Sequence, residues 1–312
     1  MNKKIHQTEN VIILGTGPAG LAAALYAARA ELNPLVLTGT ELGGQAALTD
    51  RIENYPGFPQ GVGGIELADL FQKTAERFGA RIQYETAENV DLASEPFKVK
   101  TYDQEYFAKT IIISTGASPN KINVPGENEL RGKGVSYCAT CDGIFFKDKK
   151  VAVIGGGDSA LEESLFLTRY AKSVSVIHRR NELRAGVFLQ NCARENSKVN
   201  FIWDTIVEKI NGLDSVQSLE LKNLITEARS TFPVNGVFIF IGHSPNTSMF
   251  KDQLEMDQMG YLVVDARMRT KIAGVFAAGE VADPHYRQVI TSAGMGAAAA
   301  IEATRYLANL KK

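Results

Sequence analysis

Two cysteines, Cys138 and Cys141, are the residues of this 312-residue chain whose type and spacing point most directly to chemistry. A disulfide across so short a loop stabilises a fold by only about 2 kcal/mol, against about 4.7 kcal/mol for a hundred-residue loop. A structural zinc site would need two more ligands, and the histidines are scattered along the chain. We therefore expect a redox-active pair and no metal site, with Cys192 as an unpartnered thiol that packs on a helix.

An apolar strand and a glycine-rich turn follow the cysteine pair. The strand, Lys150 to Ile154, leads into Gly-Gly-Gly-Asp-Ser-Ala, with alanine where the dinucleotide-binding pattern has its third glycine. Such a strand, turn and helix bind a pyrophosphate at the helix N-terminus. We expect the thiol pair and a nucleotide site to share one module. The turn residues expected at the nucleotide are Gly155, Gly157, Asp158 and Ser159.

A basic cluster follows the next predicted strand, Ser173 to Ile177. At this offset an acidic residue would bind the ribose 2′-hydroxyl of NAD, whereas guanidinium groups pair with the 2′-phosphate of NADP. The cluster therefore predicts NADPH as the nicotinamide cofactor, and a solvated basic helix start is the alternative. The residues concerned are His178, Arg179, Arg180 and Arg184.

Another dinucleotide turn lies near the start of the chain, between the strand Asn10 to Leu14 and an alanine-rich helix over residues 21–30. Its first glycine permits a tight turn, its second lets the backbone approach a pyrophosphate, and its third allows close packing of helix and strand. A glycine turn that binds nothing is the alternative. The residues of this turn are Gly15, Thr16, Gly17, Pro18, Ala19 and Gly20.

The second strand of this module, Pro34 to Leu37, ends in Thr38 and Gly39, where the general pattern predicts Asp or Glu at a ribose. The loop over residues 43–58 is too long and too rich in glycine and proline for a simple connection. We expect it to line a ligand, and ordinary turn formation is the alternative. Its candidate residues are Gly43, Gly44, Gln45 and Asn54.

Apolar residues recur at helical spacing over residues 65–78, which predicts a helix with one face in the core. The residues expected in that core are Leu67, Leu70, Phe71 and Phe78. Short strands are predicted at Phe97 to Thr101 and Ile111 to Ser114.

Two linkers divide the chain. Gly116 to Gly134 is rich in glycine and proline, and Ile241 to Asn246 is the matching return. Strands predicted at residues 199–203, 216–221 and 236–241 close a second α/β unit between these linkers. We expect the boundaries to leave residues 1–117 and 246–312 on one side and residues 118–245 on the other.

The tail combines a Gly279-Glu280 turn with an alanine-rich helix that is predicted to begin after Arg287-Gln288. The positive end of that helix would face whatever lies in front of it, and a bound flavin there would be favoured in its anionic reduced form. A buried packing helix is the alternative, and both descriptions can hold together.

The composition of the chain limits which kinds of molecule it is expected to bind. Apolar residues make up 45% of the chain, enough for two cores, and 34 basic residues nearly balance 35 acidic ones. Neither nucleic acid nor a membrane surface is expected as a partner. The first ten residues lack the apolar stretch of a signal peptide, so we expect a cytoplasmic protein.

These features together resemble the low-molecular-weight, prokaryotic-type thioredoxin reductases over essentially the whole chain. The motifs that carry the resemblance are the two glycine turns, Gly43-Gly-Gln45, Cys138-Ala-Thr-Cys-Asp142, His178-Arg-Arg180 with Arg184, Ile241-Gly-His-Ser-Pro-Asn246 and Tyr286-Arg-Gln288. The resemblance implies an α/β fold with two Rossmann-like dinucleotide-binding domains, in which an FAD domain is interrupted by an NADPH domain. It also implies a homodimer with thioredoxin as the partner protein.

The resemblance assigns further residues. Thr38 to Gln45 and Val281 to Ile290 would contact FAD, and the family tolerates threonine at the end of the second strand. Glu280 stands where the family more usually has Asp beside the ribityl chain. Further FAD contacts are implied at Gly116, Gly279, Arg287, Gln288 and Val289, and an NADPH contact at Ile241.

The resemblance also implies roles in the reaction. Cys141 would face the flavin, and Cys138 would attack the disulfide of thioredoxin. Asp142 would be the general acid, with a helix-capping Asp as the alternative. Because NADPH and the thiols would both have to reach one flavin, we expect the inserted domain to swing about residues 117–120 and 242–246.

Alternative functions would use some of the same groups. A related flavin dithiol oxidoreductase could serve a peroxiredoxin, a ferredoxin or oxygen, although the arginine cluster disfavours the last two. A peroxiredoxin-linked reductase would carry an additional thioredoxin-like portion. A redox sensor that binds nucleotide without turnover is the alternative from another class.

Overall fold

The chain folds into two compact units. The structure, a computed structural model, describes residues 8–49 and 51–310, so residues 1–7, which belong to the segment in which we expect no signal peptide, lie outside it. One unit comprises the described parts of Met1–Ser118 and Ser244–Lys312, and the other is Pro119–His243. The chain therefore leaves the first unit, builds the second, and returns.

A sheet of seven strands forms the centre of the first unit within the described residues. Strands β3, β2, β1 and β6 run parallel in this order, β17 continues the parallel set on β6, and β5 and β4 add an antiparallel edge. The strands are β1 (Thr8–Leu14), β2 (Leu35–Leu37), β3 (Arg81–Gln83), β4 (Asn89–Asp91), β5 (Phe97–Lys100), β6 (Glu105–Ile113) and β17 (Val275–Ala277).

The register aligns the carboxyl ends of the parallel strands. Leu14 lies opposite both Leu37 and Ile113, and Ile113 lies opposite Ala277. Parallel strands buried on both faces are expected to be continuously apolar, as are β2, β17 and the buried half of β1, residues 11–14. The segments that follow β1, β2, β6 and β17 therefore emerge at one edge of the sheet, where ligands bind in open α/β folds.

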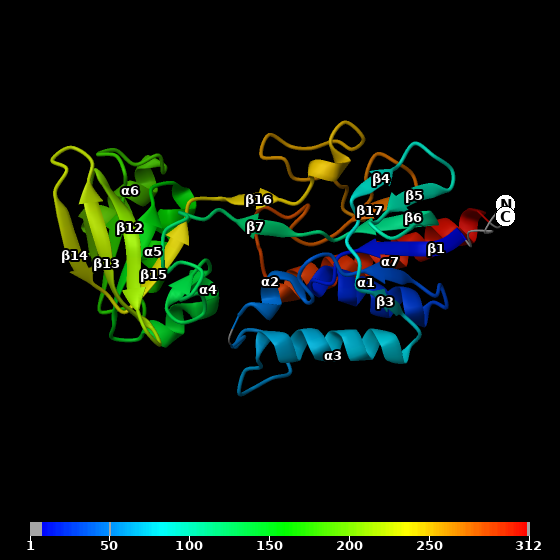
Figure 1. The fold of residues 1–312 in the computed structure, drawn as a ribbon, viewed down its shortest axis with the longest axis horizontal. Helices are drawn as coiled ribbons and strands as arrows, with labels where there is room; N and C mark the ends of the chain where they lie inside the picture. Colours follow the sequence, from blue (N-terminus) through cyan, green and yellow to red (C-terminus); the bar gives the residue numbers. More distant parts are fainter. Residues whose placement is uncertain (1–7, 50, 311–312) are drawn as a thin grey trace. The chain divides into compact units, whose positions relative to one another are not determined.

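Two alanine-rich helices, α1 (Pro18–Arg29) and α7 (Val289–Leu310), pack side by side on one face of this sheet (Figure 1). Their approach is close, because a Cβ at Gly296 would lie 2.0 Å from the backbone oxygen of Ala19. Helix α7 begins directly after Gln288, as predicted. The other helices of this unit are α2 (Gly44–Ala47), α3 (Gly64–Arg77) and the 3-10 helix η2 (Ser248–Phe250).

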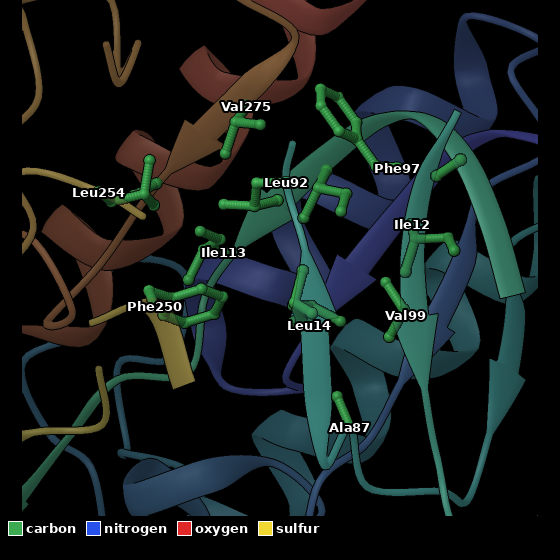
Figure 2. Close-up of a cluster of buried hydrophobic side chains, with 14 of the residues drawn as sticks. Ile12, Leu14, Ala87, Leu92, Phe97, Val99, Ile113, Phe250, Leu254 and Val275 are labelled. Carbon is green, nitrogen blue, oxygen red and sulfur yellow. The ribbon is translucent and has the colours of Figure 1, made fainter. Parts of the chain in front are cut away.

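The opposite face carries a core that joins segments from before and after the insertion. Figure 2 shows Phe250, Leu254 and Val275 among side chains from the N-terminal segment, including Leu14 and Ile113. Because all of these side chains are at least nine-tenths buried, neither segment could bury its apolar face without the other. The first unit is therefore one domain made from two stretches of sequence.

Helix α3 corrects part of the predicted core. Leu67 is buried and Phe71 is half-buried, but Leu70 and Phe78 are 40% and 41% exposed. Only one narrow stripe of the helix packs on α1 and α2, while Arg29 and Arg77 cover the ring of Phe78 from outside. The periodicity gave the helix correctly but overestimated the width of its buried face.

The inserted unit has its own parallel sheet, in the order β11, β10, β9, β15, β8. Its strands are β8 (Val135–Ser136), β9 (Lys150–Gly155), β10 (Ser173–Ile177), β11 (Val199–Ile202) and β15 (Gly236–Phe240). Its helices are α4 (Ala139–Asp142), the 3-10 helix η1 (Gly143–Phe146), α5 (Asp158–Leu167) and α6 (Val187–Glu195). Cys192 lies on α6 as a partly buried free thiol.

A separate antiparallel sheet covers this parallel sheet. It contains β12 (Thr205–Gly212), β13 (Val216–Asn223) and β14 (Arg229–Pro233), joined as consecutive hairpins. Residues 216–221, which we expected to close the α/β unit, therefore belong to a meander. Side chains from both sheets, including Ile154, Leu219 and Ile239, share one core.

Two short strands, β7 (Ala117–Pro119) and β16 (His243–Pro245), pair where the chain passes between the units. Gly242 has φ +104° immediately before β16, and the Asn120 N–H donates to its carbonyl oxygen. No helix in the described part of the chain combines the length and the apolar character that a membrane crossing requires.

Candidate redox and nucleotide sites

Cys138 and Cys141 form a disulfide at the junction of β8 and α4, with their Cα atoms 5.3 Å apart. Cys138 has extended backbone and caps α4, and its sulfur accepts the Cys141 N–H at 3.2 Å. The Thr140 hydroxyl lies 3.3 Å from the same sulfur. After reduction, two donors would face Cys138 Sγ, and hydrogen bonds of this kind favour a thiolate.

Asp142 is the last residue of α4, and its carboxylate is held by a side chain of the strand that precedes the cysteines. The Ser136 hydroxyl donates to Asp142 Oδ2 at 2.5 Å. Asp142 stands at the N-cap position of η1, but its side chain makes no capping hydrogen bond there, so the helix-capping role is not supported. The carboxylate instead lies within the same turn as both sulfurs, a suitable place for a proton donor.

The segment before the cysteines is anchored by a buried carboxylate. Glu127 is fully buried and accepts the backbone N–H groups of Ile122 and Asn123 and the Tyr137 hydroxyl, the last at 2.7 Å. Burial, then the bond to Glu127, raises the pKa of Tyr137, which keeps the phenol protonated. The residue next to Cys138 is thus fixed to the loop over 122–127.

The first glycine turn fits a dinucleotide. Gly15 has φ +106°, and a Cβ at Gly20 would lie 2.0 Å from the Gly15 carbonyl oxygen, so the turn and helix touch. A Cβ at Gly17, by contrast, would have no neighbour within 4 Å. The open side of Gly17 and the N-terminus of α1 leave room for a pyrophosphate to approach the backbone.

The structure brings the predicted flavin residues of the first unit together. Thr16 Oγ1 donates to the Thr38 carbonyl oxygen at 3.2 Å and accepts the Gly43 N–H at 3.3 Å. Asn54 Nδ2 donates to Gln288 Oε1 at 3.0 Å across 234 residues of sequence. These contacts join the first glycine turn to the end of β2 and the loop over 43–58 to the tail.

Other predicted flavin-binding residues lie elsewhere in the first unit. A small recess has apolar walls from α1, α2, α3 and α7. Gln45 turns outward, where Nε2 donates to Glu41 Oε2 at 3.0 Å. Gly116 has φ +68° and accepts the Asn246 N–H at 2.9 Å immediately before β7. The residues lining the recess are Pro18, Leu21, Gly43, Ala46, Leu67, Ala68, Phe71 and Val289.

The tail presents two carboxylates beside the first turn. Gly279 has φ +80°, and its Cβ would lie 2.8 Å from that of Ala19. Burial raises the pKa of the adjacent Glu280 to about 7, with Asp283 adding to the rise and Arg287 opposing it. Asp283 Oδ2 is buried and has no hydrogen-bond partner among the described residues. A ligand that brings hydroxyl groups, as a ribityl chain does, suits such acceptors.

The second glycine turn repeats these features in the inserted unit. A Cβ at Gly155 would lie 2.5 Å from the Phe240 carbonyl oxygen, whereas Gly157 faces open space. Asp158 Oδ1 accepts the Gly186 N–H at 2.7 Å, and Arg184 N–H donates to the Gly156 carbonyl oxygen at 2.7 Å. These bonds bring the predicted turn and the predicted arginine segment together. Ser159 is exposed in the first turn of α5.

The arginines are placed to meet an anion. Arg179, Arg180 and Arg184 are exposed at the carboxyl end of β10, and none forms an ion pair within the part of the chain that the structure describes. His178 differs from them, because its ring is buried against Gly156 and burial lowers its pKa. Ile241 packs against the core at the end of β15.

Sequence reasoning missed the residues that support the redox pair. Ser136, Tyr137 and Thr140 are contiguous with the motif, but residue type alone does not show which hydroxyl reaches which partner. Glu127 gave no signal either, since an acidic residue in a linker is ordinarily solvated. Asp283 likewise gave no sign that its carboxylate would be buried.

Comparisons with known proteins agree with this architecture. The family model of the pyridine nucleotide-disulphide oxidoreductases matches residues 9–296. Thioredoxin reductase of Streptomyces coelicolor is 49% identical over 304 residues, which cover 96% of this chain and 94% of that protein. Thioredoxin reductase of Rickettsia bellii is 47% identical over 305 residues, 96% and 98% of the two chains. The crystal structure of thioredoxin reductase from Streptococcus pyogenes has a TM-score of 0.93 at 42% identity and covers 97% of this chain and 99% of that one.

The chain therefore belongs to the pyridine nucleotide-disulphide oxidoreductase family, whose two nucleotide turns and redox disulfide it carries. Membership implies the use of a flavin and a pyridine nucleotide. Within this family it is of the low-molecular-weight, bacterial thioredoxin reductase type. The α/β fold with two Rossmann-like domains that the sequence predicted is confirmed.

Proposed function

We propose that this protein reduces the disulfide of thioredoxin with electrons from NADPH, through FAD and the Cys138–Cys141 pair. The observation that carries the proposal is the disulfide itself, which lies beside Asp142 in a unit that also bears a dinucleotide turn. The names of the relatives support thioredoxin as the substrate. The other glycine turn supplies the place for the flavin.

FAD is assigned to the first unit and NADPH to the inserted unit. The open side of Gly17, the paired Asn54 and Gln288, and the carboxylates of the tail support FAD. Three exposed arginines at the end of β10 support NADPH over NADH, because guanidinium groups bind a 2′-phosphate through charge-assisted hydrogen bonds. When bound, these cofactors supply hydride transfer and the two electrons that open the disulfide.

The reduced cysteine pair would act as follows. The Cys138 thiolate, which the Cys141 N–H and the Thr140 hydroxyl face, attacks one sulfur of the thioredoxin disulfide. A mixed disulfide forms, and the other thioredoxin sulfur leaves as a thiolate that takes a proton from Asp142. Cys141 then gives its proton to Asp142 and attacks Cys138 Sγ, which re-forms the Cys138–Cys141 bond. The second thioredoxin sulfur leaves as a thiolate that takes a proton from water, and thioredoxin is released as a dithiol. Two electrons and two protons pass in total.

The arrangement in the cell is a further part of the proposal. We assign the protein to the cytoplasm as a homodimer, on the strength of its resemblance to the family. A swing between the units is compatible with their division, since each is compact and the chain passes between them at residues 118–119 and again at 243–244. Such a motion would let NADPH and the thiols reach one flavin in turn.

The test is an absorbance spectrum of the purified protein before and after NADPH, followed by oxidised thioredoxin. A flavin spectrum bleached by NADPH and restored by thioredoxin is the expected result. Bleaching that only oxygen, a ferredoxin or a peroxiredoxin reverses would reject thioredoxin as the substrate. Consumption of one equivalent of NADPH without turnover would identify a sensor.

Serine variants of the cysteines test the path of the electrons. Cys138→Ser and Cys141→Ser are each expected to lower thioredoxin-dependent NADPH oxidation by at least about 1,000-fold, because one sulfur cannot complete the exchange. Bleaching of the flavin by NADPH should survive in both. Cys192→Ser is the matched control and should retain parent activity. Full activity in either of the first two variants would overturn the proposed electron path.

A further inference from the structure

Ser136, the last residue of β8, lies between the redox cysteines and Asp142. Its side chain is 5% exposed, and its hydroxyl oxygen lies 2.5 Å from Asp142 Oδ2. The same oxygen accepts the backbone N–H of Cys138 at 3.1 Å and lies 3.2 Å from the Cys138 carbonyl oxygen. One buried hydroxyl therefore connects the carboxylate to the backbone of the first cysteine.

The position of this hydroxyl is fixed by the sheet. Strand β8 pairs in parallel with β15, and Ser136 stands opposite Phe238, a fully buried residue. A side chain on a paired, buried strand has little rotational freedom. Asp142, in contrast, lies on a helix of a single turn. The serine is the rigid member of the pair, so it can position the carboxylate.

A hydroxyl has one proton and two acceptor positions, so these contacts allow two arrangements. With Asp142 ionised, Ser136 Oγ–H donates to Oδ2 while Oγ accepts the Cys138 N–H. With Oδ2 protonated, the carboxyl O–H donates to Ser136 Oγ, and the serine proton turns to the Cys138 carbonyl oxygen. The hydroxyl makes two hydrogen bonds in the first arrangement and three in the second. The Cys138 carbonyl oxygen accepts the Asp142 N–H in both, so neither arrangement carries the cost of an unmatched buried polar group.

We propose that Ser136 is a positioning residue for the thiol–disulfide reaction, a hydroxyl that holds Asp142 beside the cysteine pair in both its ionised and its protonated form. This inference rests on the proposed function and deepens it. Asp142 gives one proton to the departing thiolate and regains one from a cysteine thiol, and Ser136 ends each cycle with the single proton it began with.

The first test is steady-state kinetics of Ser136→Ala with thioredoxin. Acid catalysis by a positioned group contributes about 100-fold or more to a rate, so loss of its support should lower kcat about ten-fold. KM for thioredoxin should change less than about two-fold, because Ser136 is buried and does not reach the partner. Ser136→Thr keeps the hydroxyl and should recover most of kcat.

A double-mutant comparison separates positioning from a general structural role. In an Asp142→Asn background, Ser136→Ala should lower kcat less than about two-fold further, because the group it positions is gone. Ser164→Ala is the matched control, since Ser164 is fully buried on α5 of the same unit and its hydroxyl donates only to the Ala160 carbonyl oxygen among the described residues. It should leave kcat unchanged.

A spectroscopic measurement gives a readout that does not depend on turnover. Infrared difference spectra between the disulfide form and the dithiothreitol-reduced form should contain a carboxyl band that Asp142→Asn removes. That band should shift in Ser136→Ala and keep its position in Ser136→Thr and Ser164→Ala. An unmoved band in Ser136→Ala, or equal effects of Ser136→Ala with and without Asp142, would overturn the inference. Absence of thioredoxin-dependent NADPH oxidation in the parent protein would instead reject the proposed function.

Discussion

Glu280 provides the sharpest link between the structure and a measurable property. Burial is the main reason that its pKa rises from 4.5 to about 7, and Asp283 adds to the rise. The folded state therefore binds more protons than the unfolded state between these two values, and the free energy of unfolding must fall as the pH rises through this window. Well above pH 7 the folded state carries the full free-energy cost of the ionised, buried Glu280, and well below pH 4.5 this cost vanishes.

The size of this effect on the free energy of unfolding follows from the size of the pKa shift of Glu280. A difference of about 2.5 in pKa corresponds to about 3 kcal/mol at about 1.4 kcal/mol per unit. Glu280→Gln removes the titration while keeping nearly the same side-chain volume. Because a free glutamate is already partly ionised at pH 5, the variant should gain about 2 to 3 kcal/mol over the parent between about pH 5 and pH 8.

The assay is urea unfolding of flavin-depleted protein at several pH values, followed by far-UV circular dichroism. The single tryptophan, Trp203, lies in the inserted unit, so its fluorescence follows that unit separately from the one that holds Glu280. Glu88→Gln makes the same change of charge at an exposed position of the first unit and serves as the control. Parallel pH curves for Glu280→Gln and its parent would refute the reasoning, as would a parent that becomes more stable as the pH rises.

Two further outcomes are expected. Gly20→Ala should lower the free energy of unfolding by about 2 kcal/mol or more, because its Cβ would lie 2.0 Å from a backbone oxygen. Gly17→Ala, whose Cβ would meet no neighbour, should fold normally but lose flavin affinity. Thermal unfolding and the flavin content of the purified variants distinguish the two outcomes. Arg180→Ala should raise KM for NADPH about ten-fold or more while leaving KM for NADH within two-fold, measured with both cofactors, and equal changes for both would reject a 2′-phosphate contact.

Much of the site could be predicted because its motifs are contiguous. A glycine turn between a strand and a helix, or two cysteines within one turn, depends on residues that are neighbours in the sequence, so their spacing already defines the local geometry. The passage between the two units near residues 116–119 and the start of α7 after Gln288 also depend on residues that are neighbours in the sequence. The order in which strands, glycine turns and helices follow one another along the chain predicted the fold class.

The rest depended on residues that are distant in sequence. Asn54 and Gln288 meet across 234 residues, and nothing in either segment specifies the other. The exposure of Leu70 and Phe78 depends on how wide a stripe of α3 the helices α1 and α2 can cover. The antiparallel sheet over 205–233 was not foreseen, because a short apolar strand carries no sign of whether its partner runs parallel or antiparallel.

The sequence by itself determined the chemistry available to this protein: a redox pair, two glycine turns of the dinucleotide-binding pattern and a basic cluster, all set by local backbone geometry and residue type. Only the tertiary structure decided how that chemistry is supported. Hydrogen bonds and burial depend on the full three-dimensional environment of each atom. This environment creates the hydrogen bonds from Ser136 to Asp142 and from Tyr137 to Glu127, and it raises the pKa of Glu280 to about 7.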